Sequence, residues 1–259
     1  MKSLKILFVG NSFAVDTMEH AANVALALGV QNVKFGTLFI GGCSIDMHYE
    51  NAIGELPAYV YYTNIGEGWS KEEGYRISDA VKNCDWDWIA IQHGTKGTSR
   101  YTSLECYKNL TPLISYIKKI APIHTKIAFN LTWMGEPTYQ HHEIVSYCGD
   151  ISSMRKKLEE VTRKTVLSNL LVDLLVPTGT AIENARTSGI GLLTRDGYHL
   201  SLDKGRYIAA LTFIGTITDL PVDQISWTPE GVDEYARQVA IESAINARKN
   251  PLEITISAL

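Results

Sequence analysis

The sequence has 259 residues, of which 45% are hydrophobic and 20% are charged, and its formal net charge is −4. This length and balance suit one large α/β domain with its own apolar core. No cluster of lysine and arginine builds a positive face, so we expect no nucleic-acid partner. The chain has no run of eighteen apolar residues and no apolar stretch typical of a signal peptide, so we expect a cytoplasmic protein that does not span a membrane.

Strand-like and helix-like segments alternate from the N-terminus. Residues 4–9 form a short apolar run that ends in glycine, which is typical of a buried parallel strand. Residues 17–28 place apolar side chains at helical spacing, and residues 33–40 predict a second strand. Residues 59–76 combine alternating tyrosines with several glycines, which indicates a small hairpin or irregular excursion inside the domain.

The same alternation continues to the C-terminus. A polar, histidine-bearing loop is expected over residues 133–149. We expect further strands at 88–92, 126–131 and 170–176, and helices at 76–83, 103–120, 152–167, 203–217 and 231–248.

Such alternation predicts a single domain over residues 1–259, with a central parallel sheet of about five strands covered by helices on both faces. Ligands of these sheets bind at the carboxyl ends of the strands. The loops that begin at Gly10, Gly41, Gln92 and Trp133 all follow predicted strand ends. We therefore expect these four loops to share one edge of the sheet.

Four cysteines are scattered along the chain without a C-x-x-C pair. This spacing indicates neither a zinc ribbon nor a redox motif of the thioredoxin kind. Because a chain of this length builds its core without disulfides, we expect reduced thiols. The cysteines are Cys43, Cys84, Cys106 and Cys148.

The segment His141–His142–Glu143 resembles part of a metal site. Adjacent histidines do not share a helix face, and no third ligand is evident. A surface loop is the favoured interpretation, so no metal or other cofactor is expected.

Ser12 is the first candidate for chemistry, because it follows the first predicted strand in Gly10–Asn11–Ser12–Phe13. A serine between a buried strand and a helix start lies where backbone N–H groups are free. Such a position can hold a nucleophile and stabilise an oxyanion together. Taken alone, the motif is equally typical of an ordinary turn residue or helix cap.

Asp196–Gly197–Tyr198–His199 is the second candidate. An aspartate three residues before a histidine, across a glycine, can reach the imidazole in one tight turn. That contact sets the tautomer of the ring and supports the imidazolium that forms when a serine attacks. In isolation, such a sequence is more often a surface loop with a capping aspartate and a solvated histidine.

The ordered combination is more specific than either part. It comprises Ser12 near the start, a glycine pair after the second strand, a polar loop after the third, and the Asp196/His199 motif before a late helix. This order resembles the SGNH hydrolase superfamily, also called GDSL-like, over nearly the whole chain. It is most similar to a bacterial subgroup with Gly-Asn-Ser-Phe near the start and Asp-Gly-Tyr-His-Leu-Ser near the end, here residues 10–13 and 196–201.

The resemblance implies a three-layer, flavodoxin-like fold and a role for each matching residue. Ser12 would be the nucleophile and its backbone N–H the first oxyanion donor. Gly42, or alternatively Gly41, would supply a second backbone N–H. His199 would be the general base, oriented by Asp196.

Two positions depart from the superfamily pattern. Asn11 stands where the first block usually has aspartate, a residue that is not the triad acid. The third block usually reads Gly-x-Asn-Asp, and its asparagine donates to the oxyanion, whereas this chain has Ile91–Gln92–His93–Gly94. Gln92 carries the same amide on a longer arm, so we expect it to take the asparagine's role.

The implied activity is hydrolysis of a small acyl ester, such as an acetyl group on a sugar, through a Ser12 acyl-enzyme. Asn11, Gly41, His93 and Trp133 are the candidate substrate contacts. Two alternatives remain open at this point: acyl transfer to a hydroxyl acceptor with the same residues, and a non-catalytic carbohydrate-binding protein of the same fold. The sequence makes no prediction about oligomeric state.

Overall fold

The computed structural model describes residues 1–93, 102–136 and 150–259, which form two compact units. Within these ranges, no helix has both the length and the apolarity needed to cross a bilayer. The single domain predicted over residues 1–259 stays a prediction. The first unit comprises Met1–Val15, Gln31–Phe129 and Lys156–Leu175, and the second comprises Asp16–Val30, Asn130–Arg155 and Val176–Leu259.

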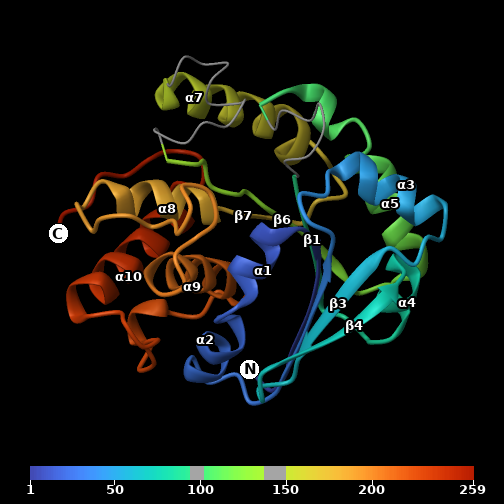
Figure 1. The fold of residues 1–259 in the computed structure, drawn as a ribbon, viewed down its shortest axis with the longest axis horizontal. Helices are drawn as coiled ribbons and strands as arrows, with labels where there is room; N and C mark the ends of the chain where they lie inside the picture. Colours follow the sequence, from blue (N-terminus) through green and yellow to red (C-terminus); the bar gives the residue numbers. More distant parts are fainter. Residues whose placement is uncertain (94–101, 137–149) are drawn as a thin grey trace. The chain divides into compact units, whose positions relative to one another are not determined.

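A seven-stranded sheet forms the centre of the first unit, with the strand order β4-β3-β2-β1-β5-β6-β7 (Figure 1). Strand β1 is parallel to both of its neighbours, β2 and β5. The predicted α/β class is confirmed. The strands are β1 (Leu4–Gly10), β2 (Val33–Phe39), β3 (Tyr59–Asn64), β4 (Trp69–Tyr75), β5 (Trp88–Gln92), β6 (Lys126–Asn130) and β7 (Leu174–Val176).

The prediction of about five parallel strands was too low, because the hairpin at residues 59–76 extends the main sheet. Strand β3 pairs antiparallel with β2, and β4 pairs antiparallel with β3. Tyr59 and Tyr61 are buried by this pairing, while β4 leaves most of its polar side chains exposed at the edge. Charged side chains on an edge strand discourage pairing with another chain.

Three helices of the first unit are α3 (Ile45–Ile53), α4 (Ile77–Lys82) and α5 (Leu110–Ile120). Helix α4 packs against β1 and β2, and α5 packs against α3 and α4. Pro112 is the third residue of α5, where the missing N–H of proline breaks no bond of the helix. The predicted helix over 103–120 is therefore shorter, preceded by the 3-10 turn η1 (Leu104–Tyr107).

The second unit is helical, with α9 (Lys204–Thr218) at its centre. Helices α8 (Thr178–Arg186) and α10 (Glu234–Lys249) pack against α9 and against each other, and α2 (Ala21–Ala27) packs against α9 (Figure 1). The turn η3 (Val222–Gln224) contacts α10. Helices α9 and α10 agree with the predicted helices to within a few residues.

Two further helices of the described residues are α1 (Ser12–Met18) and α7 (Ile151–Thr162), the latter followed by the π-helical turn η2 (Arg163–Leu167). The single helix predicted over residues 17–28 was wrong in its start, because the structure has α1 and α2 instead. Asn11 starts the earlier helix: its Oδ1 accepts the Phe13 N–H at 3.0 Å, and its carbonyl accepts the Ala14 N–H at 3.0 Å. A side-chain cap of this kind satisfies donors that a helix start leaves open.

Candidate active site

Ser12 is the first residue of α1 and lies just after the carboxyl end of β1. A Cβ atom at Gly10 would lie 2.5 Å from the Ala14 Cβ and 3.4 Å from the Gln92 Nε2. Only glycine permits this close approach of Ala14 in α1 to the end of β1. The glycine of the Gly-Asn-Ser block therefore has a packing role, and Ser12 follows two residues later, half-buried.

Asn11 connects the loops that follow β1, β2 and β5. Its Nδ2 donates to the Cys43 carbonyl at 3.1 Å and to the His93 carbonyl at 3.4 Å. Its Oδ1 accepts from Gln92 Nε2 at 2.7 Å. All of these groups are buried, so each bond is made in a water-poor setting where leaving it unmade is costly. The prediction that these three loops meet at one edge is confirmed; the loop at Trp133 belongs to the second unit.

The glycine pair after β2 forms a tight turn, closed by the Cys43 N–H to the Ile40 carbonyl at 3.1 Å. Gly42 has φ of 65°, a conformation that glycine adopts without strain. Ser44 then caps α3 by accepting the Met47 N–H at 3.2 Å. The turn that carries the predicted oxyanion donor Gly42 is thus fixed at both ends.

Beneath this turn lies a buried cluster of Cys43, His48 and Tyr59. The Tyr59 hydroxyl lies 2.8 Å from His48 Nδ1, the Cys43 Sγ lies 3.5 Å from the same nitrogen, and the two rings stack. Burial lowers the pKa of His48 to about 3, so the ring is neutral at neutral pH. The cluster packs behind the turn without introducing a charge there.

In the second unit, Asp196 and His199 form a close pair. His199 Nδ1 lies 2.6 Å from Asp196 Oδ2, and Asp196 Oδ1 accepts the N–H groups of Tyr198 at 3.0 Å and His199 at 2.7 Å. Gly197, with φ of 81°, allows the chain to turn back so tightly. The contact predicted from the spacing of these two residues is confirmed.

The environment of Asp196 keeps its carboxylate ionised. Burial by itself would raise the pKa, but the hydrogen bonds from the His199 ring and from the backbone of His199 and Tyr198 outweigh it, so the pKa is lowered. An ionised Asp196 accepts a hydrogen bond from the Nδ1–H group of His199, which leaves Nε2 as the nitrogen with the free lone pair. This is the protonation pattern that a general base needs.

Three successive carbonyl groups of this turn are hydrogen-bonded within the protein. The Gly197 carbonyl accepts from the Glu136 N–H at 2.8 Å, the Tyr198 carbonyl from Trp133 Nε1 at 2.8 Å, and the His199 carbonyl from the Arg195 N–H at 2.9 Å. The turn that carries His199 is therefore held at three consecutive residues. We name it the His199 turn, residues 195–200.

Asp16 is a polar residue of this region that the sequence did not single out. Its side chain is completely buried and contacts Arg195, Arg206 and the backbone N–H of Leu200. The two arginines lie 179 and 190 residues away in the chain. The only sequence signal was the position of Asp16 shortly after the Gly-Asn-Ser block.

Residues 5–247 match the family described as "Domain of unknown function (DUF4886)". The chain belongs to the DUF4886 family. The structure of a DUF4886 protein from Bacteroides uniformis is 32% identical over 98% of both chains, with a TM-score of 0.91. No curated protein matches the sequence.

More distant structures share the fold of this DUF4886 chain. A catalytic mutant of an acetylxylan esterase from Geobacillus stearothermophilus is 13% identical, covering 84% of this chain and 96% of its own, with a TM-score of 0.51. A member of the lipolytic G-D-S-L family from Veillonella parvula is 15% identical, covering 84% of this chain and all of its own, also with a TM-score of 0.51. The predicted flavodoxin-like fold of SGNH hydrolases is confirmed.

Several predicted site residues of the DUF4886 chain are buried and bonded within the protein. Asn11, Gln92 and His93 lie at the junction of the three loops, with exposures of 1%, 0% and 1%. Trp133 is 1% exposed, and its indole N–H supports the His199 turn. Gly41 and Gly42 are half-buried.

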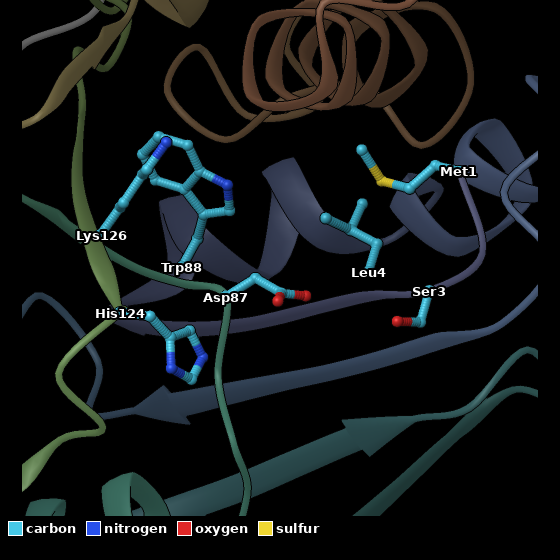
Figure 2. Close-up of a pocket in the computed structure, with 7 residues that line it drawn as sticks. All are labelled: Met1, Ser3, Leu4, Asp87, Trp88, His124 and Lys126. Carbon is cyan, nitrogen blue, oxygen red and sulfur yellow. The ribbon is translucent and has the colours of Figure 1, made fainter.

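A separate cavity of about 310 Å³ lies at the opposite ends of the strands, where β1, β5 and β6 begin. Figure 2 shows its lining, which includes Leu4, Trp88 and Lys126, the first residues of β1, β5 and β6. The Lys126 ammonium lies 5.3 Å from the centre of the Trp88 ring. Since Ser12 follows the carboxyl end of β1, this cavity is not its substrate pocket.

The sequence predicted no metal site, and its one candidate segment was residues 141–143. His141, His142 and Glu143 lie outside the described residues. Among the residues that are described, no group of three or more His, Cys, Asp or Glu side chains is arranged to hold a metal ion. Cys43, Cys84 and Cys106 carry free thiols, and Cys148 lies outside the described ranges.

Proposed function

We propose that this protein is a serine hydrolase that cleaves small acyl esters, with Ser12 as nucleophile, His199 as general base and Asp196 as the residue that orients the base. The observation that carries the proposal is the Asp196–His199 pair, with its 2.6 Å contact at Nδ1. Because this contact keeps the ring proton on Nδ1, Nε2 of His199 is the nitrogen suited to accept the serine proton.

The proposed reaction has two stages. The Ser12 Oγ attacks the ester carbonyl carbon while its proton moves to His199 Nε2, which then protonates the departing alcohol. A water molecule, deprotonated by His199, attacks the acyl-enzyme and releases the carboxylic acid and free Ser12. No metal or other cofactor takes part in this scheme.

The developing oxyanion would be stabilised by the backbone N–H groups of Ser12 and Gly42 and by the side chain of Gln92. The fixed turn at Gly41–Gly42 supports the second of these assignments, because a preorganised donor needs no rearrangement during the reaction. Gln92 has a further way to act, through its bond to Asn11. Direct donation by Gln92 and substrate contact by Asn11, Gly41, His93 and Trp133 remain predictions.

An acetylated carbohydrate is the proposed substrate. Its support is the shared fold with the acetylxylan esterase from Geobacillus stearothermophilus. A fold alone hosts many activities, so the substrate class needs its own measurement. We expect acetate release from acetylated xylo-oligosaccharides and from p-nitrophenyl acetate. Esters of longer acyl chains should be hydrolysed more slowly.

Kinetics of the purified protein test the assignment. Ser12→Ala and His199→Ala should each lower kcat by about 10⁴-fold or more, the range seen when a member of a serine triad is removed. Ser70→Ala, which changes an exposed serine on β4, is the matched control and should keep wild-type turnover. Equal activity in Ser12→Ala and wild type would refute the proposal.

The same assay separates the proposal from its alternatives. Hydrolysis releases free acetate whether or not a sugar acceptor is present, whereas acyl transfer yields a new acetylated sugar in proportion to acceptor concentration. A protein that binds acetylated sugars but releases no acetate from any of them would be the non-catalytic binding protein instead.

A further inference from the structure

We propose that Asp16 is a positioning residue for the general base, because its buried carboxylate holds both ends of the His199 turn. This inference rests on the proposed function of His199. Asp16 lies on α1, the helix that begins at Ser12, and its side chain is completely buried. Burying a carboxylate is unfavourable unless it is paired and hydrogen-bonded, so its partners show what this charge does.

Both carboxylate oxygens of Asp16 are used. Oδ1 accepts from Arg195 Nη1 at 3.0 Å and from Arg206 Nε at 2.9 Å, and it lies 2.8 Å from Arg206 Nη2 in an ion pair. Oδ2 accepts from Arg195 Nη1 at 3.2 Å and from the Leu200 N–H at 2.9 Å. One carboxylate thus binds two guanidinium groups and one peptide.

Two of these partners flank the catalytic pair in the sequence. Arg195 immediately precedes Asp196, and Leu200 immediately follows His199. The Arg195 guanidinium also donates to the Leu200 carbonyl, and the Arg195 N–H donates to the His199 carbonyl at 2.9 Å. The carboxylate therefore binds the Leu200 peptide directly and Arg195 through its guanidinium, so it contacts the residues on both sides of the Asp196–His199 pair.

The partners of Asp16 fall into two groups. Arg206, on α9, joins Asp16 to the helical core of the second unit. The bonds to Arg195 and to the Leu200 N–H join it to the residues on either side of the Asp196–His199 pair. Misplacement of a catalytic group by about 1 Å costs on the order of 10²-fold in rate, so a carboxylate that fixes this turn affects turnover directly.

The charge of Asp16 is the property to test. Asp16→Asn keeps the size of the side chain but points an amide N–H₂ at donors, so one of the arginine or Leu200 contacts is lost. We expect kcat to fall by about 10²-fold with KM within about twofold, because the base is misplaced while substrate contacts are retained. Far-ultraviolet circular dichroism checks that the variant is folded.

Glu19→Gln is the matched control. Glu19 also pairs with Arg206, its Oε2 lying 3.4 Å from Nη1, and its side chain is far more exposed than that of Asp16. This variant removes a carboxylate from the same arginine and leaves Asp16, Arg195 and Leu200 unchanged. It should keep kcat within about twofold of wild type, which separates loss of charge in general from loss of the Asp16 contacts.

A spectroscopic measurement tests the positioning independently of activity. The ring ¹⁵N signals of His199 and the downfield resonance of its Nδ1 proton report the contact with Asp196. In Asp16→Asn these signals should shift or broaden, and in Glu19→Gln they should match wild type. Signals and kcat that match wild type in Asp16→Asn would overturn the inference.

A second variant covers the case in which Asp16→Asn does not fold. Arg195→Lys keeps the positive charge but removes the guanidinium, whose Nη1 contacts both Asp16 and the Leu200 carbonyl. It should show the same direction of change in kcat and in the His199 signals, and unchanged values would again overturn the inference. If the wild type hydrolyses no ester and labels with no serine-reactive probe, the proposed function fails, while the ring signals still decide whether Asp16 positions His199.

Discussion

Two buried polar residues of different chemistry organise the loops beside Ser12 and the His199 turn. In the first unit, the neutral amide of Asn11 joins three loops through two carbonyl groups and Gln92. In the second unit, the charged carboxylate of Asp16 joins the ends of the His199 turn through two arginines and a peptide N–H.

This difference in charge determines how much stability each unit loses when its central polar residue is substituted. An amide that donates and accepts can satisfy backbone groups without any charge, so its loss costs a few hydrogen bonds. A buried carboxylate with two guanidinium groups is strongly coupled, and removal of the acid leaves cations without their partner. We therefore expect the second unit to be the more sensitive of the two to substitution at its central polar residue.

The largest expected effect on stability comes from Asp16→Ala. Removing one partner of a buried ion pair costs about 3–5 kcal/mol, because the remaining charges stay poorly compensated. Urea unfolding at equilibrium measures this loss. A cost of less than about 1 kcal/mol, the size typical of an exposed ion pair, would show that Asp16 and Asn11 are not different in kind.

Gln92 gives the next largest effect, and it sharpens the description of the Asn11 junction. If Gln92 donates to the oxyanion, Gln92→Ala should lower kcat by about 10²–10³-fold. If it acts only by holding Asn11, the loss is smaller, and the double variant with Asn11→Ala is no worse than Asn11→Ala alone. The double-mutant cycle in kcat distinguishes the two roles.

Asn11→Asp reverses the polarity of the junction at nearly constant size. An aspartate cannot donate to the carbonyl groups of Cys43 and His93, so we expect a loss of about 1–3 kcal/mol in unfolding free energy. Asn169→Asp is the control: its Oδ1 accepts the Leu171 N–H, and its other partner is the Thr111 hydroxyl, which can donate instead. A loss equal to that of the control would mean that the Asn11 donor bonds are dispensable.

The last effect is a pH dependence from His48, behind the glycine turn. Its pKa is lowered from 6.5 to about 3 in the folded protein, so the unfolded state binds one more proton between these values. Stability is then fully present above the unfolded pKa and falls by about 1.4 kcal/mol per pH unit below it, from this residue alone.

Replacing His48 by glutamine removes this titration. Urea unfolding at several values between about pH 7 and pH 4 should give a shallower loss of stability in His48→Gln than in wild type. The slopes are compared, because the absolute stability also changes when the Tyr59 contact is altered. Parallel slopes would contradict the burial of a neutral His48.

Local patterns predicted much of this molecule. The apolar run of β1, the glycine at its end and the spacing of Asp196 and His199 depend on neighbours in sequence, and each agrees with the structure. The start of α3 was also readable in principle, since Ser44 is a typical helix cap. That helix was missed because the glycine turn before it indicated a loop.

Contacts between distant residues were not predictable in the same way. Asp16 lies 179 residues from Arg195, and no spacing rule connects them. Asn11 was understood as a replacement for aspartate, yet its Nδ2 makes two bonds that aspartate cannot make. The hairpin at residues 59–76 was identified, but its pairing with β2 depends on which sheet edge is open.

Covalent labelling of Ser12 tests the central claim most directly. A fluorophosphonate probe phosphonylates only a serine that is activated as a nucleophile, and tryptic mass spectrometry locates the adduct. The account predicts one adduct, on Ser12, that is absent from Ser12→Ala, strongly reduced in His199→Ala and retained in Ser70→Ala. A folded wild-type protein that stays unlabelled at Ser12 would contradict it.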